Sequence, residues 1–266
     1  YFLANDMYKD KRIGVIAAFL MSVFWVSLFN TSRFHVDIPA LFFGLLAIYI
    51  FWKGYEKKEK IFRKIDSKWA IPIVAFLVVL TYSIRRGYFL FGVFIVLYIA
   101  LTKNWKELVK DKYNWLGLAI GLILIFIVEK AIFISAIGDV GGEYFHEELP
   151  INLLPLQVFS SFFKFGSQLN IVWFYLFWIG LILLIGKIVL SFGHIRKISD
   201  AKADLFNFLI IILTLAFFIY VLRSPTNFGE PRWYFPLLLA TFISVSKAIK
   251  LITDKTKRFH RFLPIL

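Results

Sequence analysis

"SRFHVDIPALFFGLLAIYIF", residues 32–51, joins a short polar run to a long apolar segment, a pattern that recurs along the chain. Arg33, His35 and Asp37 stand within five residues, Pro39 follows, and the apolar run then begins. Ionisable groups at the edge of a membrane span are costly, so they need a structural or functional reason. Asp37 before Ile-Pro suits a helix start, and a capping carboxylate can also face a cavity. The stretch therefore predicts a membrane helix that begins at a polar cluster.

The composition predicts an all-α polytopic transmembrane helix bundle. The chain is 60% hydrophobic and 20% aromatic, with a mean hydropathy of +0.75, which is far from the values of soluble domains. In lipid, helices satisfy their own backbone hydrogen bonds. Because the sequence contains no cysteine, it excludes disulfides, thiolate catalysis and cysteine metal sites. The chain begins with Tyr1, and we expect further sequence before it.

Eight apolar segments are predicted to cross the membrane. They are 13–30, 38–53, 69–84, 88–102, 115–136, 170–190, 205–222 and 234–250. The third and fourth are the weakest, and two interpretations stay open: two short spans joined by "RRGY", or one re-entrant feature. The inner loops are short and one longer outer loop covers about 137–169, so we expect a single transmembrane domain over residues 1–266.

The distribution of Lys and Arg predicts the orientation. With residues 1–12 placed inside, 24 of the 31 basic residues fall on inner segments, as the positive-inside rule requires. Those segments are 1–12, 53–68, 103–112, 187–202 and the tail from 247. We therefore expect a multi-pass protein of the cell membrane with both termini of this chain cytoplasmic. Orientation and anionic lipid explain the net charge of +14 better than nucleic acid does.

Two further polar clusters are predicted on the outer side. "SIRRGYF" carries Arg85 and Arg86, and the planar guanidinium is the usual partner of phosphate. The alternative is an ordinary hairpin with snorkelling arginines. The outer loop carries Glu143, His146 and Glu147 at helical spacing. Metal ligands can use that spacing, but a solvated interfacial helix is the favoured interpretation.

A fourth cluster, "RSPTNFGEPRWYFPLLLA" over 223–240, places Glu230, Arg232 and Tyr234 before the last span. Tyrosine at that depth is expected in an interfacial belt, whereas the Glu-Pro-Arg run is less easily explained. Glu129–Lys130 lies inside the outer third of a span. Because sequence neighbours do not face each other on a helix, one of the two is expected to face the bundle, and no role is assigned. Walker A, GxGxxG, HExxH and GxSxG motifs are absent from the sequence.

The order of these features resembles that of the GT-C superfamily of polytopic glycosyltransferases. "YKDKRIGVIAAFLMSVFWVSLFNTSRFHVDIPALFFGLLAIYIFWKG" is similar to the third and fourth spans of the dolichyl-phosphate-mannose protein mannosyltransferase and aminoarabinose transferase branch. "PRWYFPLLLA" is similar to the RY-x-x-P element of that branch, and "IRRGYF" falls where it carries a basic outer turn. The principal catalytic carboxylate of the family lies in a first outer loop that nothing in this chain matches. The resemblance therefore implies either the C-terminal portion of a larger GT-C membrane domain or a chain that lacks this carboxylate.

The resemblance also implies a chemistry for the polar clusters. The family moves a sugar from a polyprenyl phosphate to an acceptor glycan, lipid or protein at the outer membrane face. A carboxylate activates the acceptor hydroxyl, and arginines or a divalent cation such as Mg²⁺ or Mn²⁺ stabilise the departing phosphate. Asp37, with His35 beside it, would then be catalytic or near a metal, and the loop over 137–168 would cover the lipid. The phosphate would be bound by Arg85, Arg86 and Arg232.

The alternative functions are a polysaccharide polymerase, a lipid-linked-oligosaccharide flippase or another envelope transporter. A transporter is expected to place ionisable groups near the middle of the bilayer. In this sequence they gather at the predicted outer edge. The sequence therefore favours a glycosyltransferase.

Overall fold

The computed structural model describes residues 1–24, 36–130, 171–191, 198–221 and 235–262. Regular structure in these ranges is helical, and the described part contains no strand beyond an isolated bridge between Ile61 and Ile65. The elements are α1 (Phe2–Tyr8), α2 (Lys11–Val23), α4 (Asp37–Ile50), η1 (Phe51–Glu56), η2 (Ser67–Trp69), α5 (Ala70–Ile84), η3 (Arg86–Phe89), α6 (Leu90–Thr102), α7 (Trp105–Lys110), α8 (Lys112–Ile127), α11 (Ile171–Leu190), α12 (Ser199–Val221) and α13 (Phe235–Phe262). The predicted all-α bundle is confirmed.

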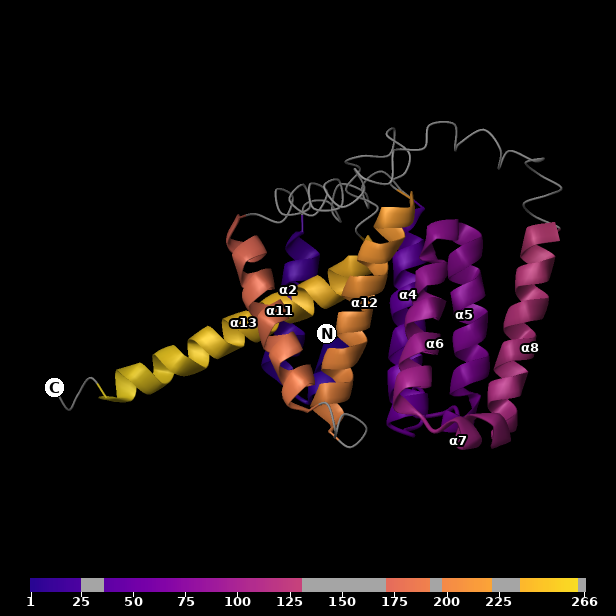
Figure 1. Cartoon of the computed structure of the whole chain (residues 1–266), viewed down its shortest axis with the longest axis horizontal. Coiled ribbons are helices and arrows are strands. Elements are labelled where there is room, and N and C mark those ends of the chain that lie inside the picture. The colour runs from indigo at the N-terminus through magenta and orange to yellow at the C-terminus, as the bar shows by residue number, and fades with distance from the viewer. Residues whose placement is uncertain (25–35, 131–170, 192–197, 222–234, 263–266) are drawn as a thin grey trace.

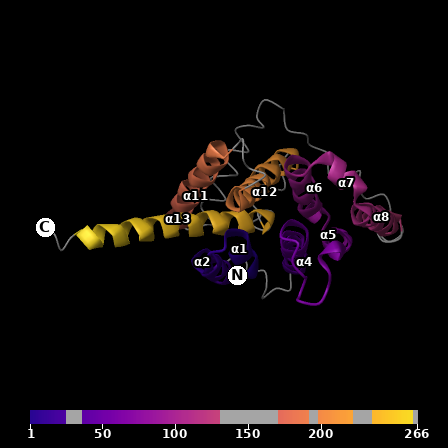
Figure 2. The ribbon, with the colours of Figure 1, turned by 90° about the horizontal axis from the view of Figure 1, so that it is seen from below.

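The helices pack side by side in a curved row. Figure 1 shows most of them roughly parallel, whereas α13 crosses the others obliquely and extends beyond the bundle. Seen from below, α5 lies between α4 and α8, and it packs against both (Figure 2). At the other side of the bundle α13 packs against α2, α11 and α12. α12 also contacts α6, which joins the two sides.

Five of the predicted crossings coincide with helices long and apolar enough to span a membrane. They are Asp37–Glu56, Ser67–Ile84, Lys112–Lys130, Ile171–Leu190 and Phe235–Thr256. The helix over Arg86–Thr102 is apolar but shorter, and α2 has 13 residues, where about 20 are needed. The remainder of the predicted 13–30 span lies outside the described residues. The polytopic architecture is thus confirmed, but the number of eight crossings stays a prediction.

The structure shows how α5 and α6 are joined, but the choice between two spans and one re-entrant feature is untested. α5 and α6 are two separate helices, and the 3₁₀ turn η3 connects them after Arg85, whose backbone is extended. Figure 1 shows the two helices standing next to each other over most of their length. The segment around "RRGY" is therefore a tight turn between two helices, and its arginines stand at the end of the bundle.

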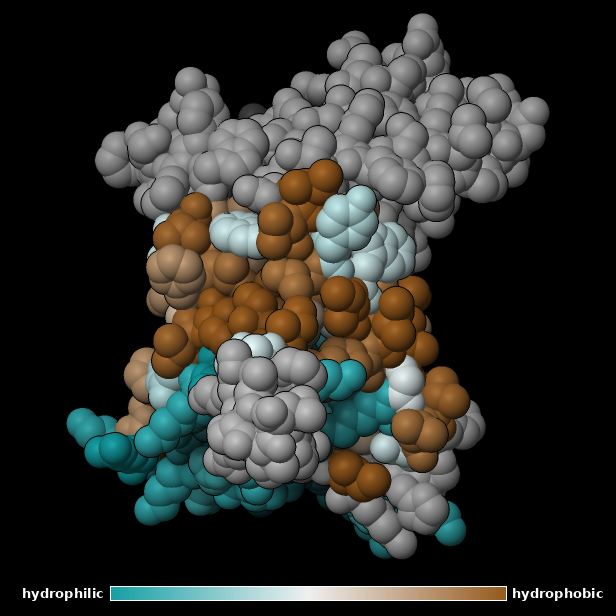
Figure 3. Space-filling view, turned by 90° about the vertical axis from the view of Figure 1, so that its left-hand side faces the viewer, coloured by the Kyte–Doolittle hydropathy of each residue, from teal (hydrophilic) through white to brown (hydrophobic). Residues whose placement is uncertain are grey.

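Successive long helices run in opposite directions, so their first residues lie alternately at one end of the bundle and at the other. α2, α5 and α8 begin at an end rich in lysine, here called the lysine-rich end. Asp10, Asp66, Asn104 and Asp111 each accept a hydrogen bond there from a backbone N–H two residues later, at 2.8–3.2 Å. Figure 3 shows hydrophilic residues at the lower end of the molecule and a hydrophobic belt above them. The start of α4 and the α5–α6 turn lie at the opposite end, here called the arginine end.

Ion pairs between distant segments hold the lysine-rich end together. Glu56 lies 2.6 Å from Lys103 Nζ and 2.6 Å from Lys202 Nζ, and its side chain is 7% exposed. These contacts join η1 to the end of α6 and the start of α12. Asp204 of α12 likewise accepts a hydrogen bond of 2.7 Å from the Tyr8 hydroxyl and pairs with Lys247 of α13. The order of the helices is therefore fixed by charge pairing as well as by apolar packing.

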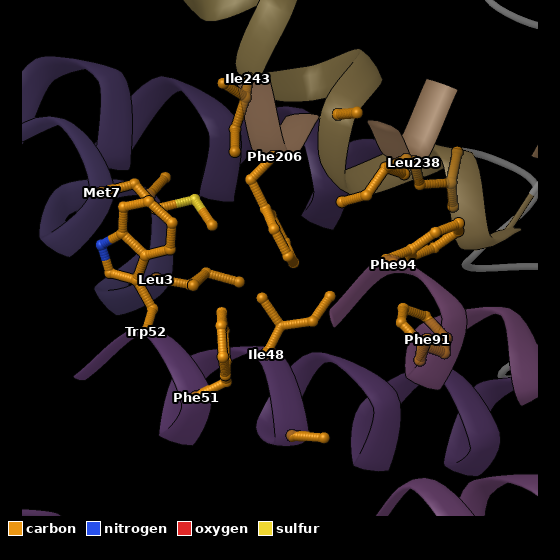
Figure 4. Close-up of a cluster of buried hydrophobic side chains, with 14 of the residues drawn as sticks. Leu3, Met7, Ile48, Phe51, Trp52, Phe91, Phe94, Phe206, Leu238 and Ile243 are labelled. Carbon is orange, nitrogen blue, oxygen red and sulfur yellow. The ribbon is translucent and has the colours of Figure 1, made fainter. Parts of the chain in front are cut away.

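The apolar core lies between the two sides of the bundle. Figure 4 shows Phe51 and Trp52 of η1 facing Phe206 of α12, with Met7 of α1 close by. The rings of Phe51 and Phe206 stack at 6.1 Å between centroids. On α11, Gly180 allows close approach to α13, because an added Cβ would lie 1.9 Å from the Ser244 carbonyl oxygen. Large aromatic residues fill the centre, and glycine is used where two backbones meet.

The end of α4 is wound more widely than an α-helix. Residues Phe51–Glu56 form the π-helical segment η1, and the backbone N–H of Lys57 donates to the Trp52 carbonyl oxygen five residues earlier. The segment carries the core residues Phe51 and Trp52 and ends at Glu56. It thus connects the hydrophobic core to the ion pairs of the lysine-rich end.

Candidate active site

A buried ion pair marks the arginine end. Asp37 is the first residue of α4, preceded by Val36 as N-cap, and its side chain is 1% exposed. Its Oδ1 lies 3.1 Å from Nε of Arg85, whose side chain is 25% exposed. The helix N-terminus also favours a carboxylate at this position. Asp37 therefore connects α4 to the α5–α6 turn, which a helix cap alone would not do.

The neighbouring arginine faces a different helix. Arg86 Nη2 lies 3.6 Å from Oε2 of Glu129, and the two side chains are 53% and 35% exposed. The Tyr82 hydroxyl donates a hydrogen bond to Oε1 of the same carboxylate. Glu129 belongs to the helical segment Lys112–Lys130 that continues α8. The two arginines of the turn are thus held by carboxylates from two different helices.

A long apolar groove begins beside Arg86. It has a volume of about 1230 Å³, lies between α5, α6 and α8, and is here called the α5–α8 groove. Tyr82 and Arg86 line it at the arginine end, and Leu108 and Asn114 line it towards the lysine-rich end. Aliphatic side chains and glycines make up most of the wall between them. The shape and chemistry suit a long hydrocarbon chain with a polar group near Arg86.

A second apolar groove of about 680 Å³ lies between α1, α2, α4 and α13. Leu41 and Leu45 of α4 form one wall, and Leu238 of α13 forms part of another. Its lining contains no charged side chain, and Asp37 lines neither groove. The α5–α8 groove is therefore the groove that combines apolar walls with a charged rim.

The structure brings together only part of the predicted site. Asp37, Arg85 and Arg86 are described, and all three lie at the arginine end. The prediction that the other polar clusters join them is untested. The residues that lie outside the described ranges are Arg33, His35, Glu143, His146, Glu147, Glu230, Arg232 and Tyr234.

The sequence alone gives no role to Glu129, which in the structure contacts two lining residues of the groove, Tyr82 and Arg86. The signal was present, since a single acidic residue interrupts the apolar run from 112 to 130. As predicted for neighbours on a helix, Glu129 faces other helices through Tyr82 and Arg86 while Lys130 is exposed. Tyr82 was not singled out either, because a tyrosine near a helix end is common.

The described residues do not by themselves form a divalent-cation site. Within the described ranges there is no group of three or more His, Cys, Asp or Glu side chains placed to hold a metal ion. Asp37 Oδ1 faces the Arg85 guanidinium, so a positive group already stands against that oxygen. We therefore derive the chemistry of the site from the arginines.

The bundle of apolar helices with charged ends defines a polytopic membrane protein. Residues 1–128 match the family model described as dolichyl-phosphate-mannose-protein mannosyltransferase. The matched region contains Asp37, Arg85 and Arg86, and it supports an assignment to the GT-C, mannosyltransferase-like membrane glycosyltransferases. No curated protein and no solved structure gives a significant match to the chain.

Proposed function

We propose that the protein transfers a sugar from a polyprenyl-phosphate donor to an acceptor glycan, lipid or protein at the outer face of the cell membrane. The observation that carries this proposal is the position of Arg86. It stands at the rim of a long apolar groove, next to the buried Asp37–Arg85 pair. Such a site offers one surface for a hydrocarbon chain and one cation for its phosphate. The family match supports the glycosyl-transfer chemistry.

The burial of the two ion pairs supports different roles for the two arginines. An exposed ion pair such as Arg86–Glu129 is worth only about 0–1 kcal/mol, so a phosphate can replace the carboxylate on Arg86. Removing one partner of a buried pair costs about 3–5 kcal/mol, and Asp37 is almost fully buried. Arg86 is therefore the phosphate-binding residue of our proposal, whereas Arg85 stays with Asp37. The sequence predicted that both arginines bind phosphate, and our proposal keeps this role for Arg86 alone of the two.

Asp37 acts through the turn in this proposal. Its carboxylate contacts Arg85 and lines neither groove. By holding Arg85 it fixes the turn that presents Arg86 to the donor. We assign Asp37 a positioning role on this geometry. The direct catalytic role predicted for Asp37 and His35 remains a prediction.

The transfer step places negative charge next to Arg86. The acceptor hydroxyl attacks the anomeric carbon and gives its proton to a base, while the bond between that carbon and the phosphate oxygen breaks. The electron pair of that bond leaves with the polyprenyl phosphate. A guanidinium placed beforehand at this oxygen stabilises the developing charge without reorganising, which is how fixed cations lower such barriers. The position of Arg86 beside the apolar groove supports this role for it.

The test is donor binding and glycosyl transfer by the full chain in lipid nanodiscs. A panel of polyprenyl-phosphate sugars is offered to the wild-type protein and to Arg86→Ala. We expect transfer from at least one donor in the wild type, and the variant should lose donor affinity. Lys106→Ala on α7 is the matched control, because it removes one exposed positive charge at the opposite end. Unchanged donor affinity in Arg86→Ala would reject the proposed phosphate site.

A further inference from the structure

Glu129 contacts Tyr82 and Arg86, two residues that line the arginine end of the α5–α8 groove. It is the sole acidic residue of the sequence between 112 and 130. Its two carboxylate oxygens are shared between Tyr82 of α5 and Arg86 of η3. An acid inside an apolar helix is costly unless it has such partners. This position therefore indicates a function of Glu129 that an apolar residue could not perform.

The packing of α8 makes these contacts important for its position. Gly117 is the buried residue of α8, and it allows contact with α5, since an added Cβ would lie 2.5 Å from Ile71 Cγ2. Further along the helix, Leu118, Leu122 and Phe126 are exposed. α8 is thus packed closely on α5 near the lysine-rich end. At the arginine end, Glu129 supplies its charged and hydrogen-bonded contacts to Tyr82 and Arg86.

A carboxylate and a phosphate compete for the same atoms of an arginine. Each can accept two parallel hydrogen bonds from the planar guanidinium group, because two of its oxygens have a spacing that matches the two N–H donors. The Arg86 side chain is half exposed, and its distance of 3.6 Å to Glu129 is longer than a good charged hydrogen bond. The pair is therefore weak enough to exchange with an incoming anion.

We propose that Glu129 is a gate for the donor: its carboxylate occupies the phosphate position on Arg86 and holds α8 against the α5–α6 turn until a polyprenyl phosphate displaces it. When the phosphate binds Arg86, Glu129 is released and the arginine end of α8 moves away from α5. The groove then widens at its arginine end, where the lipid chain enters beside Arg86. This inference rests on the proposed donor, and it adds a mechanism by which the site distinguishes a lipid phosphate from an uncharged lipid. An uncharged polyprenol cannot compete for Arg86 and does not open the gate.

The first experiment measures binding of a polyprenyl phosphate and of the polyprenol of equal length to the full chain in nanodiscs. Glu129→Gln keeps the size of the side chain and removes its charge. We expect it to bind the phosphate about two- to fivefold more tightly than the wild type, the equivalent of one exposed ion pair. Polyprenol should also bind this variant more tightly than the wild type, because the groove is open before any ligand is added. Adding Arg86→Ala to Glu129→Gln should abolish the preference for the phosphate over the polyprenol.

The outcomes separate the gate from the proposed function. A wild type that prefers the phosphate over the polyprenol, together with equal or weaker phosphate binding in Glu129→Gln, would overturn the gate alone. A wild type without any preference for the phosphate would overturn the proposed donor and the gate together. Tyr82→Phe removes the other contact of Glu129, and we expect a smaller gain in the same direction. No gain in either variant rejects the gate.

The second experiment follows the helix itself. The sequence contains no cysteine, so nitroxide labels on Ser83→Cys and Lys130→Cys report a single distance without background. We expect this distance to increase when polyprenyl phosphate is added to the otherwise wild-type chain, and polyprenol should leave it unchanged. In Glu129→Gln the longer distance should be populated before any ligand is added. A distance that stays the same in all of these samples would overturn the opening of α8.

Discussion

Arg85 and Arg86 follow each other in the chain, but they pair with carboxylates on two different helices, Asp37 of α4 and Glu129 at the end of α8. α5 lies between those helices and packs against both (Figure 2). The α5–α6 turn is therefore held from two directions, once by a buried contact and once by an exposed one. This difference in burial underlies the roles that we propose for the two arginines.

The Arg86 guanidinium should be required for donor binding but not for stability. Arg86→Ala and Arg86→Lys are expected to weaken donor binding by about tenfold or more, because an ammonium lacks the fork that a phosphate matches. The free energy of unfolding should change by less than about 1 kcal/mol, because the side chain is half exposed. Donor affinity and thermal unfolding in nanodiscs measure the two effects. Normal donor binding by Arg86→Lys would return Arg86 to a snorkelling role.

Asp37→Asn should lower turnover by a factor on the order of a hundred or more if Asp37 serves the reaction. Since Asn and Asp suit helix starts about equally, any effect on the helix start is small. Asn keeps a side-chain oxygen that can accept from Arg85, so losing only the charge should cost about 1–3 kcal/mol of unfolding free energy, less than removing a partner from a buried pair. Glycosyl transfer and thermal unfolding of the same preparation test both. Full turnover by Asp37→Asn would show that Asp37 has no role in the reaction.

A double-mutant cycle between Asp37 and Arg85 should show whether Asp37 acts through the arginine. If Asp37 positions Arg85, then Asp37→Asn, Arg85→Gln and the double variant lose similar amounts of turnover. The coupling energy is then expected to be about 0.5–3 kcal/mol, as for residues in contact. The measurement is kcat and KM for donor in all four proteins. Additive losses in kcat would instead support the direct catalytic role.

Glu56→Gln should destabilise the lysine-rich end. The carboxylate is 7% exposed and contacts two lysines, so its loss leaves both ammonium groups without their acceptor. We expect a cost of about 2–4 kcal/mol, between a charged hydrogen bond and a fully buried pair. Lys68→Gln is a suitable control, because its pair with Asp66 is exposed on both sides. Equal unfolding temperatures of the two variants would contradict the prediction.

The Asp10 carboxylate should make the stability of the protein change with pH in the acidic range. Partial burial acts to raise the pKa of this carboxyl. Opposing effects outweigh burial and hold the pKa below 3.8: the hydrogen bond from Lys250, the hydrogen bond from the backbone N–H of Arg12, and the positive charges of both residues. A carboxyl whose pKa is lowered on folding stabilises the protein above its unfolded pKa, and this contribution is lost as the pH falls through the folded pKa. Asp10→Asn keeps the helix cap. Its unfolding temperature should be lower than that of the wild type at neutral pH, and the difference should shrink below about pH 4.

The orientation can be tested with single cysteines, because the chain has none of its own. A cysteine at Ser67, at the lysine-rich end, should resist a membrane-impermeant thiol reagent in intact cells, since lysine-rich loops stay on the cytoplasmic side. A cysteine at Ser224, which lies outside the described residues, should react. Labelling of Ser67 from outside would reverse the predicted orientation.

The sequence was sufficient to predict the long apolar helices, because uncharged apolar runs between charged loops leave few alternatives in a membrane. It did not predict the short helices α1 and α7. It placed Asp37, Arg85 and Arg86 at the same end. It could not show that Asp37 contacts Arg85 while Arg86 contacts Glu129, because this depends on α5 lying between α4 and α8. Hydropathy runs carry no information on which helices are neighbours. For the same reason the sequence alone gives no role to Glu129, whose partners Tyr82 and Arg86 lie on other segments.

The π-helical segment at Phe51–Glu56 has a consequence for length variation among related chains. A π-helical turn contains about one residue more than an α-helical turn of the same height along the helix axis. Loss of one residue here would let the backbone return to ordinary α-helical winding, and the residues before and after would keep their directions. Anywhere else in α4, a one-residue deletion would rotate all later side chains by about 100°. The end of α4 is therefore where this helix can gain or lose a residue in evolution while Glu56 still reaches Lys103 and Lys202.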